Sequence, residues 1–289
     1  MRKQQAPTAA LVFASVGGSI VGPVIGGFLA AGKAEWVIAT QLIFGLSAQA
    51  LQYFIPETRS SVILTKEAKR RRANGEMVWS QAELDELPSN DKEYWNNVFR
   101  IWRRPFVMLA TEPIVLFLSL ISGFSDALIF TYLEALPLVM QQWSFNAWQT
   151  GLCFLSIGLG YCIAWLIWSC EIMYWSKRQE QLVNKPERRL RWLLWTAPAL
   201  PLSMFAFAWL ATGPPRHWIE ACVWLVFIGV ANYAIYGSTV DYMIAAYGEK
   251  YSASATGGNG FSRDVLAGVS AFYARACTYI SLSQGFDRR

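Results

Sequence analysis

Residues 14–30 read ASVGGSIVGPVIGGFLA, and they lie inside a run from Ala6 to Gly32 that contains no charged side chain. A helix rises about 1.5 Å per residue, so this run is long enough to cross a hydrocarbon core of about 30 Å. Small residues recur at every fourth position and form one stripe along a helix face: Ala14, Gly18, Gly22, Gly26 and Ala30. Such a stripe lets two helix backbones approach closely in lipid. The stretch therefore predicts a membrane-spanning helix that packs tightly against a neighbour.

Long apolar runs recur along the rest of the 289-residue chain, in which 54% of the residues are hydrophobic and 16% are charged. Six membrane spans are expected, at about residues 9–31, 36–55, 108–137, 148–170, 192–212 and 218–240. A seventh apolar segment starts near Val265 and is broken by Arg275. The sequence therefore predicts an all-α fold, a polytopic transmembrane bundle of about six to seven spans in the lipid bilayer.

Lys and Arg are concentrated in alternate connections between these spans. Residues 56–105 and 171–191 are rich in both, whereas the connections on the other side contain only Lys33 and Arg216. Because basic loops near span ends resist translocation, the basic side is expected to be cytoplasmic, and the N-terminus with it. The net charge of +5 is therefore explained by membrane orientation, and no nucleic-acid partner is expected.

The first span contains the pattern Gly18-x-x-x-Gly22-Pro23-x-x-Gly26-Gly27. A plain helix-dimerisation face is one interpretation. The pattern also resembles the antiporter motif on the fifth helix of drug:proton antiporters of the major facilitator superfamily. Further short matches to fungal multidrug or polyamine antiporters follow in the family's order: Pro56-Glu57-Thr58-Arg59, Arg104-Pro105-Phe106, Thr111-Glu112-Pro113, Pro186-Glu187-Arg188-Arg189-Leu190 and Ser252-Ala253-Ser254-Ala255 with Asn259 and Arg263. The resemblance covers roughly residues 10–274.

This resemblance implies a partial major facilitator fold in four parts. Residues 1–55 would form two helices from the end of the N-terminal bundle, and residues 56–105 a cytoplasmic central loop with an interfacial helix. Residues 106–274 would form an incomplete C-terminal bundle, followed by a divergent tail at 275–289. Because the match starts at the family's fifth helix and no twelfth is evident, the chain is expected to be truncated at both ends.

The function that the resemblance implies is proton-coupled efflux of amphiphilic or cationic small molecules, such as drugs or polyamines. The plasma membrane is favoured over the vacuolar membrane. A chain without the family's first four helices is expected not to transport alone, since alternating access needs two bundles. The alternative is a non-transporting membrane remnant that associates with full-length transporters through the glycine stripe.

Carboxylates within the third span are the candidate proton or substrate site, because charges inside a bilayer are costly unless paired or protonated. Asp126 lies among apolar residues, and Glu134 lies two turns further towards the outer surface. A structural alternative for Asp126 is a hydrogen bond with a neighbouring hydroxyl of Ser122, Ser125 or Tyr132. Asp241 and Arg263 form a candidate gate pair at the cytoplasmic mouth, with simple interfacial placement as the alternative.

The last part of the central connection, residues 93–104, reads EYWNNVFRIWRR. Its apolar side chains fall on one helical face with arginines beside them, which suits a helix lying in the lipid headgroup layer. The upstream cluster Arg70–Arg72 has two interpretations, a solvated cytosolic face or a site for anionic lipids.

Enzyme chemistry finds little support in the sequence. The single histidine, His217, excludes His-based metal motifs, and no nucleophile signature surrounds it. The stretch Thr256-Gly257-Gly258-Asn259-Gly260 lacks the spacing of a nucleotide-binding loop and is expected to be a flexible cytosolic turn. The five cysteines have no metal-ligand spacing. No catalytic residue, metal or cofactor is therefore expected.

Overall fold

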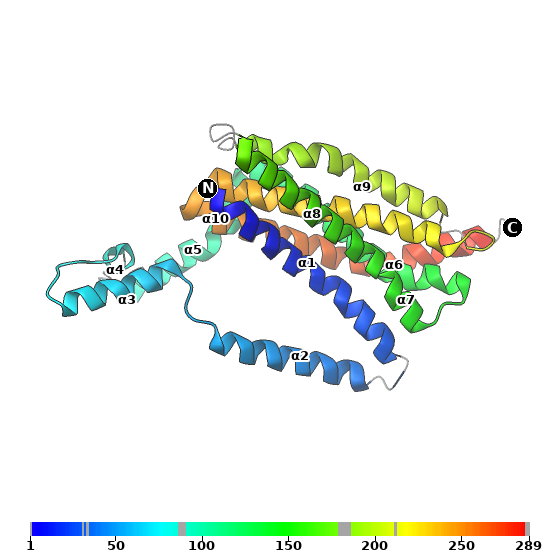
Figure 1. Ribbon diagram of the computed structural model, residues 1–289, viewed down its shortest axis with the longest axis horizontal. Helices are drawn as coiled ribbons and strands as arrows, with labels where there is room; N and C mark the ends of the chain where they lie inside the picture. The colour runs from blue at the N-terminus through cyan, green and yellow to red at the C-terminus, as the bar shows by residue number, and fades with distance from the viewer. Residues whose placement is uncertain are drawn as a thin grey trace. The chain divides into compact units, whose positions relative to one another are not determined.

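The computed structural model describes residues 2–30, 32, 35–85, 91–178, 186–210 and 213–286, and within these ranges the regular structure is helical (Figure 1). The helices are α1 (Arg2–Ala30), α2 (Glu35–Phe54), α3 (Ser60–Ala73), α4 (Gln81–Asp85), α5 (Asp91–Thr111), α6 (Pro113–Met140), α7 (Ala147–Cys153), α8 (Leu155–Arg178), α9 (Arg191–Leu210) and α10 (Trp218–Phe286). Short 3-10 helices, η1 and η3, cover Gln141–Trp143 and Pro186–Leu190.

Six of these segments are long and apolar enough to cross a membrane: Gln5–Ala30, Glu35–Phe54, Pro113–Trp143, Ala147–Tyr174, Arg191–Leu210 and Trp218–Gly248. They confirm the six predicted spans and the all-α class. The third span starts later than predicted, because Glu112 has extended backbone angles between α5 and α6. Pro113 follows at the first position of α6, where its missing N–H costs no intrahelical hydrogen bond.

The helix α10 consists of two helices that meet at Gly248, which has a φ of 60° and a ψ of −168°. We call residues 218–247 the first part of α10 and residues 249–286 its second part. The second part remains helical beyond Arg275, and it is not among the six described segments that are apolar enough to cross a membrane. It also contains Thr256–Gly260, so the predicted flexible turn is wrong. A Cβ on Gly258 would lie 2.9 Å from the carbonyl oxygen of Pro105, so this glycine allows two helices to approach closely.

The chain divides into two compact units, one formed by Met1–Lys33 with Arg104–Arg289 and the other by Ala34–Arg103. We call the first unit the bundle. Within it, α10 packs against α6, α8 and α9, and α1 packs against α7 and α8 (Figure 1). The largest fully buried side chains include Tyr161, Tyr233, Leu136, Met140 and Ile157. The four-part division predicted from the resemblance remains a prediction, and the last three residues of its tail lie outside the described ranges.

Helix α1 packs against the other helices of the bundle through a different face from the predicted stripe. A Cβ on Gly27 would lie 2.7 Å from the carbonyl oxygen of Ala147, and one on Gly151 would lie 3.0 Å from the carbonyl oxygen of Pro23. By contrast, a Cβ on Gly18, Gly22 or Gly26 would meet nothing within 4 Å. The packed face also carries larger apolar residues, Val12, Val16 and Ile20, whose burial removes more apolar surface from water than glycine burial does. Docking of the glycine stripe itself therefore remains a prediction.

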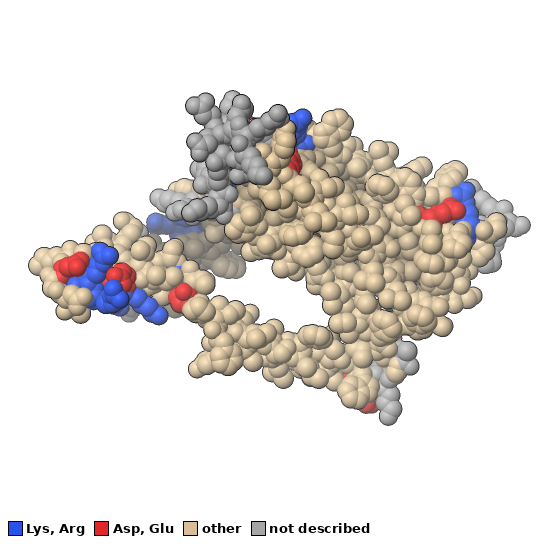
Figure 2. All heavy atoms as spheres, viewed as in Figure 1, with Lys and Arg blue, Asp and Glu red and all other residues tan. Residues whose placement is uncertain are grey.

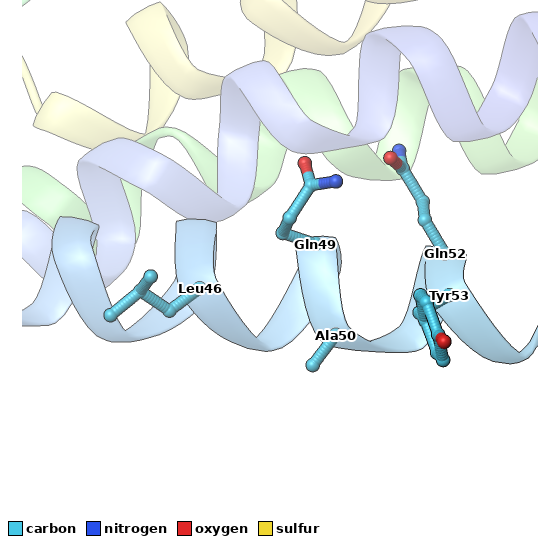
Figure 3. Close-up of a pocket in the computed structure, with 5 residues that line it drawn as sticks. All are labelled: Leu46, Gln49, Ala50, Gln52 and Tyr53. Atoms are coloured by element: carbon cyan, nitrogen blue, oxygen red, sulfur yellow. The ribbon is translucent and has the colours of Figure 1, made fainter.

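In the second unit, α2 has no buried residue. A hollow along this helix is lined by Leu46, Gln49, Ala50, Gln52 and Tyr53 (Figure 3). Gln49 and Gln52 point to one side of α2, while Ala50 points to the other (Figure 3). Because all five exposed residues come from one helix, the hollow is a feature of its open surface and encloses no site.

The helices α3 and α4 are joined by a polar contact. Arg72 donates to Glu83 at 2.5 Å, and its guanidinium lies 4.1 Å from the ring centroid of Trp79. The backbone N–H of Ser80 also donates to Glu83, at 3.1 Å. This backbone hydrogen bond, with a further contribution from Arg72, holds the pKa of the Glu83 carboxyl below its ordinary value.

Candidate functional site

A buried ion pair joins α6 to the second part of α10. Arg263 donates from Nη2 to Oδ1 of Asp126 at 2.9 Å, and the two side chains are 13% and 12% exposed. The backbones approach closely here because residue 123 is glycine. A Cβ on Gly123 would lie 3.2 Å from the carbonyl oxygen of Ser262 and 3.4 Å from the Cα of Arg263. The pair therefore places a positive and a negative charge together inside the bundle.

The first part of α10 supports this pair from another side. The guanidinium carbon of Arg263 lies 3.6 Å from the ring centroid of Tyr236, a cation–π contact. One residue before Asp126, Ser125 accepts a hydrogen bond from Asn232 at 2.9 Å. Asn232 in turn accepts one from the hydroxyl of Tyr161 on α8 at 3.2 Å. Three helices, α6, α8 and α10, thus contribute polar side chains to the interior around the ion pair.

Several polar atoms near this ion pair have no hydrogen-bond partner in the described part of the chain: Ser119 Oγ, Ser122 Oγ, Asn259 Oδ1 and Arg263 Nε. Ser122 and Ser119 precede Asp126 on α6 by about one and two turns, and Asn259 precedes Arg263 by about one turn. Buried polar groups are usually satisfied, by water or a ligand where the protein supplies no partner. Ser122 Oγ, Asn259 Oδ1 and Arg263 Nε are therefore buried polar atoms within about one turn of the ion pair whose partners the described residues do not supply.

The partner of Asp126 differs from the hydroxyls considered from the sequence. Ser125 accepts from Asn232, Tyr132 donates to the backbone oxygen of Met204 at 3.2 Å, and the Ser122 hydroxyl has no partner. The sequence signal that could have identified Arg263 is its position in an apolar segment, where a charged residue usually pairs with another. The separation of 137 residues between the partners gave no local indication.

Glu134, the second carboxylate of the predicted site, does not join the cluster. Its side chain is 48% exposed, and its carboxylate lies 3.9 Å from Nε of Arg275. This contact is longer and more open than the pair formed by Asp126 and Arg263. A role at the outer surface remains a prediction for Glu134.

Asp241 has a different partner from the one predicted. Arg189, in η3, donates to Oδ1 of Asp241 at 2.6 Å, and these side chains are 6% and 2% exposed. Gln5 of α1 donates to the other carboxylate oxygen at 3.3 Å. The predicted pairing of Asp241 with Arg263 is therefore wrong. Asp241 lies about 10 Å and Arg263 about 22 Å along the helix from the kink at Gly248, so the two lie at different depths.

The described residues contain no group of three or more His, Cys, Asp or Glu that could hold a metal ion. Two ion pairs are among the buried polar features of the described residues. A set of membrane-spanning helices with charges paired in its interior defines a multi-pass membrane protein.

The Major Facilitator Superfamily model matches residues 2–271, and the chain belongs to this superfamily. An MFS-type transporter of Penicillium rubens, paaT, is 30% identical over 290 residues, which cover 98% of this chain and 50% of that protein. Transporter mfs1 of Schizosaccharomyces pombe is 30% identical over 273 residues, covering 91% of this chain and 50% of that protein.

A probable drug/proton antiporter of Saccharomyces cerevisiae, YHK8, is 27% identical over 257 residues, covering 87% of this chain and 49% of that protein. The chain thus spans about half the length of these curated relatives. No solved structure matches the chain.

Proposed function

We propose that the chain forms part of a proton-coupled efflux antiporter for amphiphilic or cationic small molecules, with Asp126 as the proton and cation site. The observation that carries this proposal is the Asp126–Arg263 pair, buried between two helices of a major facilitator chain. A relative described as a probable drug/proton antiporter supports the coupling to protons.

The ion pair suggests how exchange works. In the resting state Arg263 neutralises the Asp126 carboxylate, which lowers the cost of holding a charge inside the bundle. A proton on Asp126 removes the negative charge that attracts Arg263. A cationic substrate would compete with both the proton and Arg263 for the same carboxylate, and such competition is the basis of antiport.

The second ion pair, formed by Arg189 and Asp241, supports a cytoplasmic gate in which Arg189 takes the place expected for Arg263. Asp241 stays in this gate, with Arg189 as its partner, and Arg263 belongs to the deeper pair. Gln5 adds α1 to the contact, so the gate links helices that are distant in sequence. Opening of this end would require the Asp241 carboxylate to exchange these partners for water.

The test is transport in liposomes under an imposed pH gradient. The purified 289-residue chain is reconstituted alone and together with a fragment of paaT that supplies the family's first four helices. Co-purification first establishes that the two pieces assemble. We expect proton-driven uptake of a fluorescent cation only when both are present, and loss of that uptake with Asp126→Asn. Uptake by the assembled pieces that is unchanged in Asp126→Asn would overturn the assigned site.

A second candidate function is association with full-length transporters without transport. The observation that favours it is the glycine stripe of α1, of which Gly18 and Gly22 are exposed and meet no neighbour. We expect the chain to co-purify with a full-length relative and Gly22→Leu to weaken that association. Val21→Leu, at an exposed position beside the stripe, is the matched control. Association unaffected by Gly22→Leu would exclude the stripe as the contact.

A further inference from the structure

The helix α5 carries an exposed aromatic face ahead of the third span. Trp95, Phe99 and Trp102 are 68%, 60% and 67% exposed, and their spacing places them on one side of the helix. Val98 lies on the same side, whereas Asn97 lies on the opposite side. Aromatic side chains of this kind are typical of helices that lie in a membrane interface.

Arg103 borders this aromatic face, and Arg100 lies further round the helix, about 100° from Phe99. Arg100 and Arg103 are exposed, and the described part of the chain forms no hydrogen bond or ion pair with either. Arg104 differs, because its guanidinium lies 5.1 Å from the ring centroid of Tyr251. The charges of Arg100 and Arg103 are therefore available to an external anion.

The basic cluster of α3 has its charge partly compensated within the chain, where three arginines pair with two glutamates. Arg70 and Arg71 both pair with Glu67, at 3.3 Å and 3.2 Å, and Arg72 pairs with Glu83. Figure 2 shows acidic and basic residues intermingled over α3 and α4. Of the two interpretations of Arg70–Arg72, this arrangement favours the solvated face over an anionic-lipid site.

We propose that residues 95–103 of α5 dock on an anionic phospholipid surface. The aromatic face would enter the boundary between headgroups and acyl chains, and Arg100 and Arg103 would contact lipid phosphates. α5 ends at Thr111 and the membrane-spanning helix α6 begins at Pro113, which keeps this segment close to the bilayer along the chain. The proposal is independent of the transport function.

The test uses the full chain in lipid nanodiscs, with its five cysteines replaced by alanine. A single cysteine is introduced by Phe99→Cys or by Asn97→Cys and labelled with an environment-sensitive dye. In nanodiscs that contain phosphatidylserine, we expect blue-shifted emission from position 99 and much less from position 97. Replacement of phosphatidylserine by phosphatidylcholine, or the addition of 1 M salt, is expected to reverse the shift because the Debye length falls to about 3 Å.

Charge variants show whether the arginines of α5 or those of α3 attract the anionic membrane. Each basic residue near an anionic leaflet contributes about fivefold, so Arg100→Gln with Arg103→Gln should lower the ratio of docked to undocked α5 roughly 25-fold. Arg70→Gln with Arg71→Gln is the matched control and should change it little. Arg100→Lys with Arg103→Lys keeps the charge and should preserve docking, which separates lost attraction from misfolding.

Three results would overturn the proposal. The first is equal emission from positions 97 and 99, and the second is a position-99 shift that is the same in neutral and anionic nanodiscs. The third is a shift that is lost with the α3 variants and kept with the α5 glutamine variants.

Discussion

At the scale of single residues, the Asp126–Arg263 pair is expected to hold α6 and the second part of α10 together. Asp126→Asn leaves Arg263 as a buried charge without its counter-ion, which should destabilise the chain by about 3–5 kcal/mol. The measurement is thermal unfolding of the detergent-solubilised protein. Glu134→Gln is the control, since the 3.9 Å contact of this half-exposed carboxylate with Arg275 should contribute less to stability than the buried pair does.

The double variant Asp126→Asn with Arg263→Gln removes both charges. Its loss in the free energy of unfolding should be smaller than the sum of the losses of the two single variants, because no unpaired charge remains. Additive losses would contradict a direct interaction between the two side chains.

A second residue-scale prediction concerns the partner of Asp241. A double-mutant cycle of Asp241→Asn with Arg189→Gln should give a coupling energy of about 0.5–3 kcal/mol, since the two side chains are in contact and buried. The same cycle with Arg263→Gln in place of Arg189→Gln should be additive. Coupling to Arg263 and none to Arg189 would reverse the assignment made from the structure.

At the scale of helices, α1 should tolerate added volume on one face and not on the other. Gly27→Ala places a methyl group against the carbonyl oxygen of Ala147 and should cost about 1–3 kcal/mol through overpacking. Gly22→Ala adds the same methyl group where nothing lies within 4 Å, so the unfolding temperature should stay close to that of the unmodified chain. If both variants unfold alike, the packed face of α1 has been assigned incorrectly.

The contact between α3 and α4 should depend on pH through Glu83. Its pKa is lowered in the folded chain, so the stabilisation it provides is present above the ordinary value of 4.5 and is lost as pH falls through the lowered value. Hydrogen exchange of residues 60–85, corrected for the intrinsic rate, should therefore stay slow down to a pH below 4.5 and then accelerate. Glu83→Gln should show fast exchange already at neutral pH, while Glu67→Gln should not.

The spans could be predicted from the sequence because apolar length is a local property of the chain. Six of them were found this way, and the errors concern contacts between distant residues. Arg263 lies closer in sequence to Asp241 than to Asp126, yet the kink at Gly248 and the depth of each residue decide the pairing. Likewise, Gly257 and Gly258 suggested a turn. In the structure Gly258 lies within a helix, where a Cβ would be 2.9 Å from the carbonyl oxygen of Pro105. Glycine composition alone does not distinguish a flexible turn from a close helix contact.

At the scale of the whole molecule, the remaining prediction is the direction in which the chain crosses the membrane. Lys and Arg are abundant in residues 56–105, so this connection should be cytoplasmic, whereas the connection containing Arg216 should lie on the opposite side. Lys33, the other basic residue expected there, lies outside the described residues. Opposite placement of the two connections is also required by an odd number of spans between them, namely 113–143, 147–174 and 191–210.

Labelling of single cysteines in sealed vesicles of known orientation checks this direction. In a chain without its own cysteines, Gly75→Cys, in the turn after α3, should react with a membrane-impermeant maleimide only from the cytoplasmic side. Arg216→Cys, in the turn before α10, should react only from the other side. Reaction of both positions from one side would mean that an even number of spans lies between them, which would contradict the six-span arrangement. Reaction from opposite sides in the reverse sense would keep the spans and overturn the cytoplasmic placement of the gate formed by Arg189 and Asp241.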